Sequence, residues 1–425
     1  MSVTSQADKA RQSALKLQGY STDDKNKVLS AIAEGISAYK DFIIAENKKD
    51  LDIFPDKTSA LFDRLLLNEK RVMQMVEGVR AVIDLKDPVG EVTAEWDRPS
   101  GLHIKKVRAP LGVVAIIYEA RPNVTVDAAV LCIKSGNAAI LRGSRQALNS
   151  NRAIYKVMSE AVEKAGFDKD IVQFIDDASH DGAKELLTCE KSVDLVIPRG
   201  GEGLKKFVLE NSLIPVLASA GGNCHIYVAK SADFQKAVDI IENSKCNKPS
   251  TCNAVEHILI DKSIAKDFLP ILNARMRACG VKVLADEFCH SLDNETTLAT
   301  DADYDTEFLA LTLTEKVVSG VSDAIDEINR RGTRHSECIV TEDKAEAEKF
   351  TTLVDAAATY VNTSTRFTDG FEFGFGAEMG ISTGKMHARG PIGLDKSDFS
   401  LNVFFFSFFI INLTKLFYRR CSTFS

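Results

Sequence analysis

The chain has 425 residues, too many for one ordinary hydrophobic core, so two or three domains are expected. Hydrophobic residues make up 45% of the sequence and charged residues 27%, which is typical of a soluble globular protein. The net charge of −7, with both signs spread along the chain, gives no basic surface for nucleic acid.

The cysteines and histidines argue against a disulfide-bonded secreted protein and against a metalloprotein. The nine cysteines have no paired spacing, and the polar start of the chain does not resemble a secretory signal, so we expect a reducing, cytoplasmic location without disulfides. The seven histidines are dispersed, and Cys246 and Cys252 stand six apart without a second pair. No metal site is therefore expected.

The first 90 residues read as mostly helical, because apolar positions recur at a spacing near 3.6. The run Ser21-Thr22-Asp23-Asp24 predicts a helix start, since such side chains accept hydrogen bonds from free backbone N–H groups. The apolar run Leu111 to Tyr118, bounded by Pro110 and Pro122, predicts a buried strand.

Strands and helices then alternate. We predict strands over 138–141, 171–175, 193–197 and 215–218, and helices over 150–164, 181–187 and 203–211. Such alternation indicates a parallel sheet covered on both faces, and these sheets bind ligands at the carboxyl ends of their strands. A second α/β block is predicted over 223–362, with strands at 258–260, 281–284 and 338–340.

Two loops follow predicted strands of the first block, Arg142-Gly143-Ser144 and Arg199-Gly200-Gly201. The second is rich in glycine but lacks the Gly-x-Gly-x-x-Gly spacing of dinucleotide-binding loops. Without further context it fits a tight strand-to-helix turn. It also fits a phosphate site, in which Arg199 and a helix N-terminus supply positive potential.

Cys252 lies in a loop between a helical stretch that ends near Lys245 and an apolar strand. A thiolate there would be a strong nucleophile, although the position alone also fits a buried structural cysteine. Asn123 follows the strand that ends at Tyr118 and offers a side-chain amide, which could hold an oxyanion during acyl transfer. Cys246 is the rival nucleophile, but it falls at the end of the helical stretch.

Several motifs together resemble the gamma-glutamyl phosphate reductase family, within the aldehyde dehydrogenase superfamily. They are PLGVV at 110–114, YEARPNVT at 118–125, SGNA at 135–138, ILRGS at 140–144, IPRGG at 197–201, KPSTCNA at 248–254, NTSTRF at 362–367 and KMHARGP at 385–391. The resemblance implies an aldehyde-dehydrogenase-like α/β fold with a Rossmann-type cofactor domain, an α/β catalytic domain and a small oligomerisation element. We place the NADP(H)-binding domain at 1–93 and 106–222, the catalytic domain at 223–383, and the oligomerisation element at 94–105 and 384–400.

The implied reaction is the NADPH-dependent reduction of L-glutamyl 5-phosphate to L-glutamate 5-semialdehyde in L-proline biosynthesis, with release of phosphate. By this resemblance Cys252 attacks the acyl carbon to form a thioester, while its own backbone N–H and the Asn123 amide hold the oxyanion. A free cysteine titrates near pH ~8.5, so a local donor or cation must favour its thiolate. Cofactor contacts are expected from the two strand-end loops, and Glu307 matches the position that contacts the nicotinamide ribose.

The substrate carboxylate needs a bidentate cation, for which arginine is better suited than lysine. Arg121, Arg366 and Arg389 are candidates inside the matched motifs, and the sequence does not rank them. His387, beside Arg389, is expected to be structural.

Two alternatives to a reductase stay open, an oxidising semialdehyde dehydrogenase and an inactive cofactor-binding assembly partner. Hydrolytic members of the superfamily carry a glutamate before a Gly-Gly pair, where it activates water. The stretch 217–222 has no carboxylate here, which favours the reductase. A homo-oligomer is expected, and a glutamate kinase is a possible partner because acyl phosphates are short-lived.

The resemblance stops after Leu394. The tail 401–425 contains an apolar run of about 13 residues, short of the roughly 20 that a transmembrane helix needs, so a membrane partner is not expected. Translated non-coding sequence is the leading interpretation of this tail. A segment packed at a subunit interface and an interfacial membrane contact are the other two.

Overall fold

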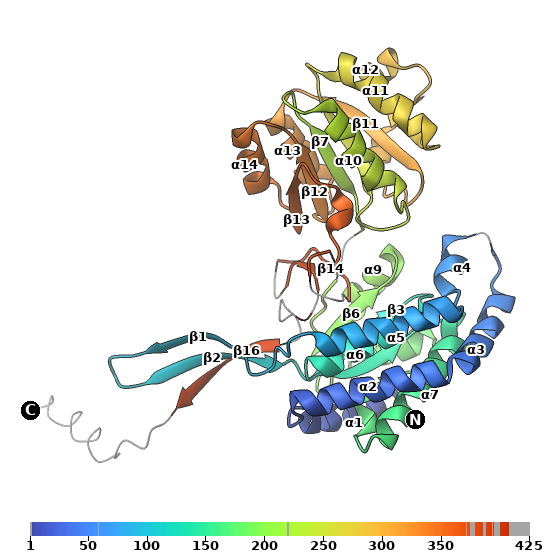
Figure 1. The fold of residues 1–425 in the computed structure, drawn as a ribbon, viewed down its shortest axis with the longest axis vertical. Helices are drawn as coiled ribbons and strands as arrows, with labels where there is room; N and C mark the ends of the chain where they lie inside the picture. Colours follow the sequence, from blue (N-terminus) through green and yellow to red (C-terminus); the bar gives the residue numbers. More distant parts are fainter. Residues whose placement is uncertain are drawn as a thin grey trace, which may run out of the picture.

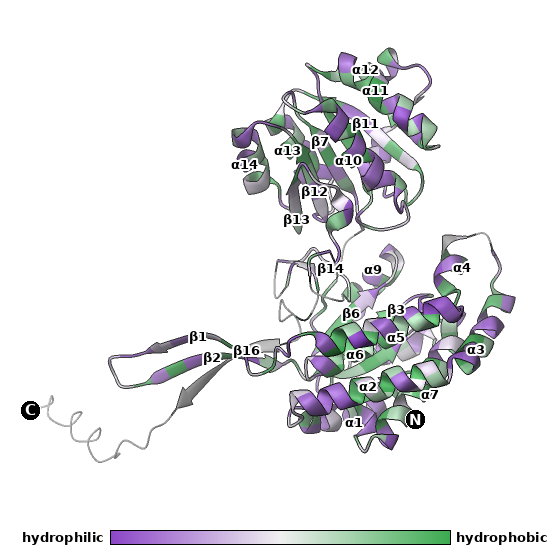
Figure 2. Cartoon of the chain, in the orientation of Figure 1, coloured by the Kyte–Doolittle hydropathy of each residue, from purple (hydrophilic) through white to green (hydrophobic). Residues whose placement is uncertain are grey.

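The computed structural model describes residues 2–57, 59–218, 221–370, 372–374, 379–385, 388–392, 394 and 400–407, the last range by its backbone alone. Two α/β lobes lie one above the other, and a thin arm of antiparallel strands extends from the lower lobe (Figure 1). In Figure 2, helices α2 and α5 alternate between hydrophobic and hydrophilic colours along their length, as amphipathic helices do.

The lower lobe begins with helices, as the periodicity of the first 90 residues predicts. They are α1 (Val3–Leu17), α2 (Thr22–Ala38), α3 (Lys40–Ile53), α4 (Ala60–Leu65) and α5 (Glu69–Asp84). The predicted helix start is confirmed, because the Ser21 hydroxyl accepts a hydrogen bond from the backbone N–H of Asp24 while the Asp24 carboxylate accepts one from the N–H of Ser21. This reciprocal pair satisfies two backbone donors that the first helical turn leaves free.

The sheet of the lower lobe has the order β5-β4-β3-β6, and every adjacent pair is parallel. Its strands are β3 (Val113–Tyr118), β4 (Ala138–Arg142), β5 (Val172–Phe174) and β6 (Leu195–Arg199). The helices around it are α6 (Pro122–Lys134), α7 (Leu148–Lys164), α8 (His180–Leu187) and α9 (Glu202–Asn211), with the 3-10 turns η1 (Arg145–Ala147) and η2 (Lys169–Ile171).

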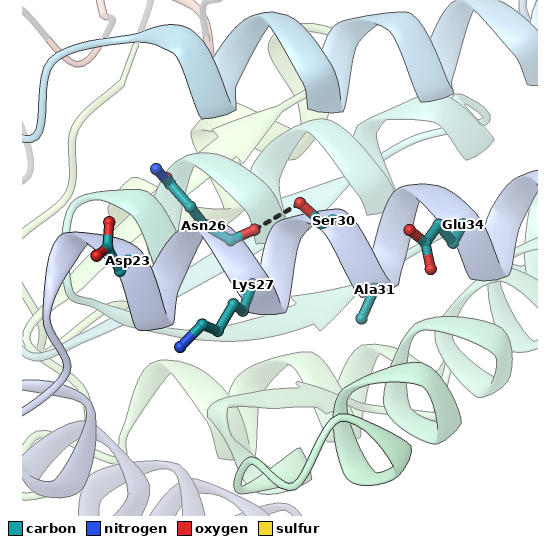
Figure 3. A pocket seen from close by; sticks show the side chains of 6 residues that line it. All are labelled: Asp23, Asn26, Lys27, Ser30, Ala31 and Glu34. Carbon is teal, nitrogen blue, oxygen red and sulfur yellow. Dashed lines mark hydrogen bonds between the residues drawn. The ribbon is translucent and has the colours of Figure 1, made fainter.

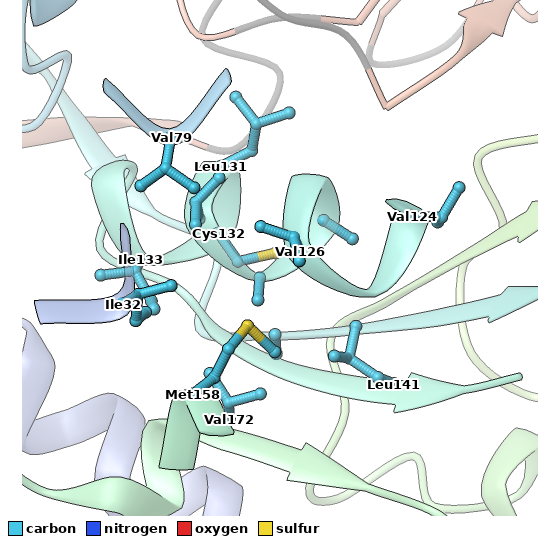
Figure 4. Close-up of a cluster of buried hydrophobic side chains, with 14 of the residues drawn as sticks. Ile32, Val79, Val124, Val126, Leu131, Cys132, Ile133, Leu141, Met158 and Val172 are labelled. Atoms are coloured by element: carbon cyan, nitrogen blue, oxygen red, sulfur yellow. The ribbon is translucent and has the colours of Figure 1, made fainter. Parts of the chain in front are cut away.

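Alternate residues of β3 enter two different apolar cores, because successive side chains of a strand point to opposite faces. Ile116 packs on one face with α2, α5, α6 and α7, and Ile117 on the other with α1, α8 and α9. Figure 4 shows Cys132 of α6 and Met158 of α7 pointing toward each other in the first core. A sheet covered on both faces has few places for polar groups except its strand ends, where the candidate loops lie.

The upper lobe has a sheet of order β10-β9-β11-β8-β7-β12-β13, and its adjacent pairs are also parallel. The strands are β7 (Cys224–Val228), β8 (Val255–Asp261), β9 (Lys282–Ala285), β10 (Thr297–Leu298), β11 (Thr312–Val318), β12 (Ser336–Val340) and β13 (Ala358–Val361). Its helices are α10 (Phe234–Cys246), α11 (Ala265–Ala278), α12 (Glu287–Leu292), α13 (Val321–Arg331) and α14 (Lys344–Leu353), with the 3-10 turns η3 (Asp301–Asp305) and η4 (Thr365–Phe367).

The arm consists of β1 (Val92–Asp97), β2 (His103–Pro110) and β16 (Ser400–Ser407), with β2 in the centre. Strand β16 runs antiparallel to β2 in continuous register, from Ser400 opposite Pro110 to Ser407 opposite His103. The apolar tail therefore starts inside a strand, and residues 408–425 lie outside the described residues. A short antiparallel pair, β14 (Ile381–Ser382) and β15 (Gly390–Pro391), completes the strands.

One predicted strand is wrong. Residues 215–218 form only an isolated bridge between Val216 and Val196, next to β6. The apolar run is buried only in part, and it makes too few ladder hydrogen bonds to count as a strand. Across the described part of the chain, no helix is both long enough and apolar enough to cross a membrane.

Candidate active site

The loop that carries Cys252 runs from the end of α10 at Cys246 to the start of β8 at Val255. The Cys252 side chain is a half-buried thiol that is not part of a disulfide, and its backbone carbonyl accepts a hydrogen bond from the Cys224 thiol at 3.2 Å. Gly222 packs directly against this backbone: a Cβ on Gly222 would stand 1.4 Å from the Cys252 carbonyl oxygen. Any larger residue at Gly222 would displace the loop.

Asn253 connects the same loop to the segment 365–368. Its side-chain amide donates to the backbone carbonyls of Thr368 at 2.9 Å and Arg366 at 3.2 Å, and its own backbone carbonyl accepts from the Thr365 hydroxyl at 2.7 Å. The Thr251 hydroxyl donates within the loop, to the carbonyl of Lys248. These bonds hold the backbone on both sides of Cys252 in a defined position.

Asn123 lies in the first turn of α6, after Arg121 and Pro122 at the helix start. Its exposed side-chain amide donates to the Asp127 carboxylate, with 2.9 Å between Nδ2 and Oδ2. Loss of hydration around Asp127 raises its pKa to about 6, although the bond from Asn123 and the charge of Arg199 act in the opposite direction.

A cavity of about 830 Å³ brings these two regions together. Its wall contains residues of the lower lobe and of the Cys252 loop, among them Arg121, Asn123, Arg199, Lys248, Ser250 and Thr251. The Arg64 guanidinium of α4 crosses from one lobe to the other and donates to the Ser250 carbonyl at 2.8 Å. The two regions that are expected to cooperate in acyl transfer therefore face one cavity.

Burial lowers the pKa of the Arg121 guanidinium to about 10, and the charges of Arg199 and Arg64 act in the same direction. A thiolate at Cys252 and the Glu119 carboxylate act in the opposite direction on that pKa. Arg121 is thus close enough to Cys252 for the two charges to attract each other. This supplies a cation of the kind that a nucleophilic thiolate needs.

A second hollow of about 390 Å³ lies on the outer surface of α2, lined by Asp23, Asn26, Lys27, Ser30, Ala31 and Glu34 (Figure 3). All of its lining comes from a single helix, and its marked hydrogen bond is the one from the Ser30 hydroxyl to the Asn26 carbonyl, within that helix. It contains none of the candidate residues.

The first predicted cofactor loop ends β4. One nitrogen of the Arg142 guanidinium donates to the Ser179 carbonyl at 2.6 Å, and burial lowers the pKa of this side chain. Gly143 is required by close packing, because a Cβ there would stand 2.0 Å from the Asn151 amide nitrogen. The buried Ser144 hydroxyl has no hydrogen-bond partner among the described residues. A buried donor left free at a strand end fits a nucleotide that bears phosphate groups.

The second predicted cofactor loop ends β6. The Gly201 N–H, at the start of α9, donates to the Glu119 carboxylate at 3.0 Å. A Cβ on Gly200 would stand 2.5 Å from the same carboxyl group, so Glu119 fills the space beside this loop. The Arg199 side chain lines the cavity with Asn123.

The Glu307 carboxylate accepts a hydrogen bond from the Gly222 N–H at 2.7 Å. It is therefore joined to the residue that packs against Cys252. Residues 219 and 220, in the stretch that lacks the hydrolytic glutamate, lie outside the described residues, as does His387.

The three candidate arginines occupy different places. Arg121 lines the cavity, whereas Arg366 contacts the Asn253 side-chain oxygen and Arg389 pairs with Asp355 at 2.9 Å. Sequence reasoning assigned no role to Asp127 or Arg64. Asp127 could have been found as the residue one helical turn after Asn123, but no local signal connects Arg64 with Ser250. Within the described ranges, no group of three or more histidine, cysteine or acidic side chains is placed to hold a metal ion.

Comparison with known proteins agrees with this geometry. The profile described as "Aldehyde dehydrogenase family" matches residues 3–290, so the chain belongs to the aldehyde dehydrogenase family and has its α/β fold. It is 47% identical over 396 residues to the gamma-glutamyl phosphate reductase of Petrotoga mobilis, covering 93% of this chain and 95% of the relative. The enzyme of that name from Clostridium beijerinckii is 50% identical over 376 residues, covering 88% and 91%.

A solved structure gives the same result. The crystal structure of gamma-glutamyl phosphate reductase from Thermotoga maritima superimposes with a TM-score of 0.93 at 43% identity, covering 96% of this chain and 98% of that one. Within the aldehyde dehydrogenases, the chain therefore belongs to the gamma-glutamyl phosphate reductase family. The predicted fold class and family are both confirmed.

Proposed function

We propose that this chain reduces L-glutamyl 5-phosphate to L-glutamate 5-semialdehyde and releases phosphate, a step of L-proline biosynthesis. Membership of the reductase family over nearly the whole chain is the observation that carries this proposal. The cavity supports it, because a substrate with a phosphoryl group and a carboxylate requires cations, and Arg121, Arg199 and Lys248 all line the wall.

In this proposal Cys252 attacks the acyl carbon as a thiolate. The carbonyl oxygen gains negative charge, which the backbone N–H of Cys252 and the Asn123 amide stabilise, and losing one such donor costs on the order of 10²–10³ in rate. The attraction between Arg121 and a thiolate at Cys252 supports this assignment. The carbon–sulfur bond forms, the carbon–oxygen bond to phosphate breaks, and a thioester remains.

NADPH is the proposed cofactor and, when bound, supplies the hydride that reduces the thioester. Arg142, Gly143 and Ser144 at the end of β4 would hold its phosphate-bearing part, with support from the unpartnered Ser144 hydroxyl. Gly200 and Gly201 remain candidates for contact with the cofactor, and Glu307 remains a candidate for contact with its nicotinamide ribose. The Glu307 bond to Gly222 puts that carboxylate beside the Cys252 loop.

We also propose the domain roles, assembly and location. Residues 1–93 and 106–222 would bind the cofactor, 223–383 would carry the catalytic loop, and 94–105 with 384–400 would join subunits of a homo-oligomer. The projecting β1–β2–β16 arm supports this last role, since it extends away from both lobes (Figure 1).

A cytoplasmic location is supported by the cysteines, none of which forms a disulfide among the described residues. Association with a glutamate kinase would shorten the path of the acyl phosphate.

The test is the reverse reaction, in which the purified protein receives L-glutamate 5-semialdehyde, phosphate and NADP. We expect phosphate-dependent formation of NADPH, and Cys252→Ser should lower its rate by roughly 10³-fold or more while NADPH still binds. Cys246→Ser is the matched control and should keep the wild-type rate.

The two alternatives give different results. An oxidising semialdehyde dehydrogenase would form NADPH without phosphate, and an inactive assembly partner would bind NADPH without any turnover. A normal rate in Cys252→Ser would show that the nucleophile is another residue.

A further inference from the structure

Arg121 and Arg199 stand close together at the ends of neighbouring strands. Strand β3 pairs with β6 in parallel register, with Tyr118 opposite Arg199, and Arg121 follows three residues after Tyr118. Both side chains line the cavity that contains Asn123, and both also line a smaller adjoining hollow with Asn123 and Asp127. Two guanidinium groups therefore converge beside the proposed oxyanion donor.

Neither guanidinium has a hydrogen-bond or ion-pair partner within the part of the chain that the structure describes. Other arginines at this cavity do: Arg71 pairs with Asp63 at 2.7 Å, and Arg64 donates to the Ser250 carbonyl. Cations withdrawn from water are normally paired, because desolvation of an unpaired charge is costly. Glu119 and Asp127 lie near enough to act on these charges, but neither carboxylate forms a direct ion pair with them in the described part of the chain. Two neighbouring guanidinium groups with their hydrogen-bond donors unused are suited to an anionic ligand.

The cofactor is the obvious anion for Arg199, since its loop is a candidate for binding cofactor phosphate. Two observations favour another ligand. The Gly201 N–H at the start of α9 is already satisfied by the Glu119 carboxylate, which would repel a phosphate at that helix end. The Arg199 side chain also faces the same cavity as Asn123, where the acyl group must lie.

We propose that Arg121 and Arg199 form the subsite for the phosphoryl group of the acyl phosphate, and for inorganic phosphate in the reverse direction. This inference rests on the proposed function and specifies which residues bind the leaving group. The reacting carbon must lie between Cys252 and Asn123, and the phosphorus is one oxygen atom away from that carbon. Paired guanidinium groups bind a phosphoryl dianion by bidentate hydrogen bonds.

The subsite assists one bond cleavage. As the carbon–sulfur bond forms and the carbon–oxygen bond breaks, the bonding electron pair leaves on the phosphate oxygen, which gains negative charge. The two guanidinium groups neutralise this charge and need no proton transfer. Arg121 would also attract a thiolate at Cys252, so Arg199 is the better residue to substitute, and the KM for phosphate is the readout because the charge of Arg199 also favours the ionised form of Asp127.

The experiment measures the reverse reaction with inorganic phosphate as the probe. Arg199→Gln should raise the KM for phosphate roughly 10- to 100-fold, the loss expected for hydrogen bonds to a charged group, while the KM for NADP is unchanged. Arg199→Lys keeps the charge but loses the bidentate geometry, so its KM for phosphate should lie between that of the wild type and that of Arg199→Gln. Arg71→Gln is the matched control, because its guanidinium is already paired, and it should leave the KM for phosphate at the wild-type value.

A rise in the KM for NADP with an unchanged KM for phosphate would overturn the inference and return Arg199 to the cofactor site. An equal rise in Arg71→Gln would also overturn it, since the effect would then come from the general positive potential of the cavity. A wild-type protein with no phosphate-dependent turnover would instead contradict the proposed function. Thermal melting of each variant identifies any change in KM that comes from misfolding. If Arg199→Gln is misfolded, the KM of Arg199→Lys for phosphate decides whether Arg199 binds phosphate.

Discussion

The Asn123 side-chain amide donates a hydrogen bond to the Asp127 carboxylate, which lies one helical turn further along α6. A carboxylate accepts hydrogen bonds and cannot donate them, so it selects the NH₂ group of Asn123 and turns the amide oxygen away. One N–H of that group is used by Asp127 and the other is left for an oxyanion. Asp127 thereby positions the donor that the proposed acyl transfer needs, without touching the substrate in this role.

The first prediction concerns Asp127→Asn. An amide at this position can donate as well as accept, so the orientation of Asn123 is no longer fixed, and we expect kcat to fall roughly 10-fold, less than the loss of the whole donor would cost. The same substitution in an Asn123→Ala background should have no further effect, because the residue being positioned is gone. Equal losses in both backgrounds would mean that Asp127 acts in some other way.

The wild-type pH profile gives a second readout for this pair. The pKa of Asp127 is raised to about 6, so the carboxylate form that accepts from Asn123 is lost as the pH falls through about 6. Arg199 and Arg121 line the smaller hollow together with Asp127, and Arg199 favours the charged form of its carboxyl group. We expect kcat to decline on the acid side near this value and that limb to be absent in Asp127→Asn.

The second prediction concerns Arg64, whose bond to the Ser250 carbonyl links α4 of the lower lobe to the Cys252 loop. Arg64→Met should release this loop, and we expect faster hydrogen–deuterium exchange in peptides covering 247–254 in the absence of substrate. Global stability should change by only about 1 kcal/mol, the usual contribution of one hydrogen bond. Arg71→Met is the control, because Arg71 pairs inside its own lobe. Unchanged exchange in Arg64→Met would mean that the contacts of the loop within the upper lobe, such as those of Asn253, are enough to hold it.

The buried strands and most helices of this fold could be predicted from the sequence because each carries its own periodic or apolar signal. The runs at 111–118 and 138–141 are found as β3 and β4 with boundaries shifted by one or two residues. The run at 215–218 is also apolar, but it pairs with β6 only through one isolated bridge, and the extent of pairing is not visible in a local pattern.

The candidate site also has a part that the sequence could predict and a part that it could not. The loops of Cys252 and Asn123 could be proposed from local motifs, but the cavity they share depends on packing between lobes. Arg389 is an example of what a local motif cannot predict. It pairs with Asp355, and nothing near Arg389 in the sequence indicates this partner. A long-range partner of a charged residue is set by tertiary structure, so three equivalent arginines could not be ranked.

The third prediction concerns a buried ion pair on either side of the Cys252 loop. The Lys245 ammonium at the end of α10 and the Glu256 carboxylate in β8 are 2.6 Å apart, and both side chains are fully buried. Burial lowers the pKa of Lys245 and raises that of Glu256 to about 7. Lys245→Met leaves the carboxylate unpaired and should lower the free energy of unfolding by about 3–5 kcal/mol.

The double variant Lys245→Met, Glu256→Gln tests the cause. It removes both charges, while the amide oxygen introduced at position 256 can still accept the backbone N–H of Leu309, as the Glu256 carboxylate does at 3.2 Å. We expect most of the lost stability to return in urea denaturation. A double variant as unstable as the single one would indicate that packing, rather than the unpaired charge, accounts for the loss.

The fourth prediction concerns Glu315, a fully buried carboxyl group in β11. Burial raises its pKa from 4.5 to about 8, although the neighbouring Asn273 amide acts in the opposite direction. The unfolded chain loses this proton near pH 4.5, whereas the folded chain keeps it until about pH 8. Between these values the folded state binds one more proton than the unfolded state, so the free energy of unfolding falls as pH rises, by about 1.4 kcal/mol per unit at most.

Glu315→Gln removes this titration, because an amide is neutral in both states. Relative to the wild type, its melting temperature should therefore rise with pH, with the largest gain at about pH 8 and a small difference at about pH 5. Thermal melts across this range measure the trend, and Glu287→Gln, at an exposed position in α12, is the control that should follow the wild type. Parallel curves for Glu315→Gln and the wild type would contradict this prediction. They would mean that Glu315 has the same pKa in the folded and unfolded chains, so that burial does not keep its carboxyl group protonated.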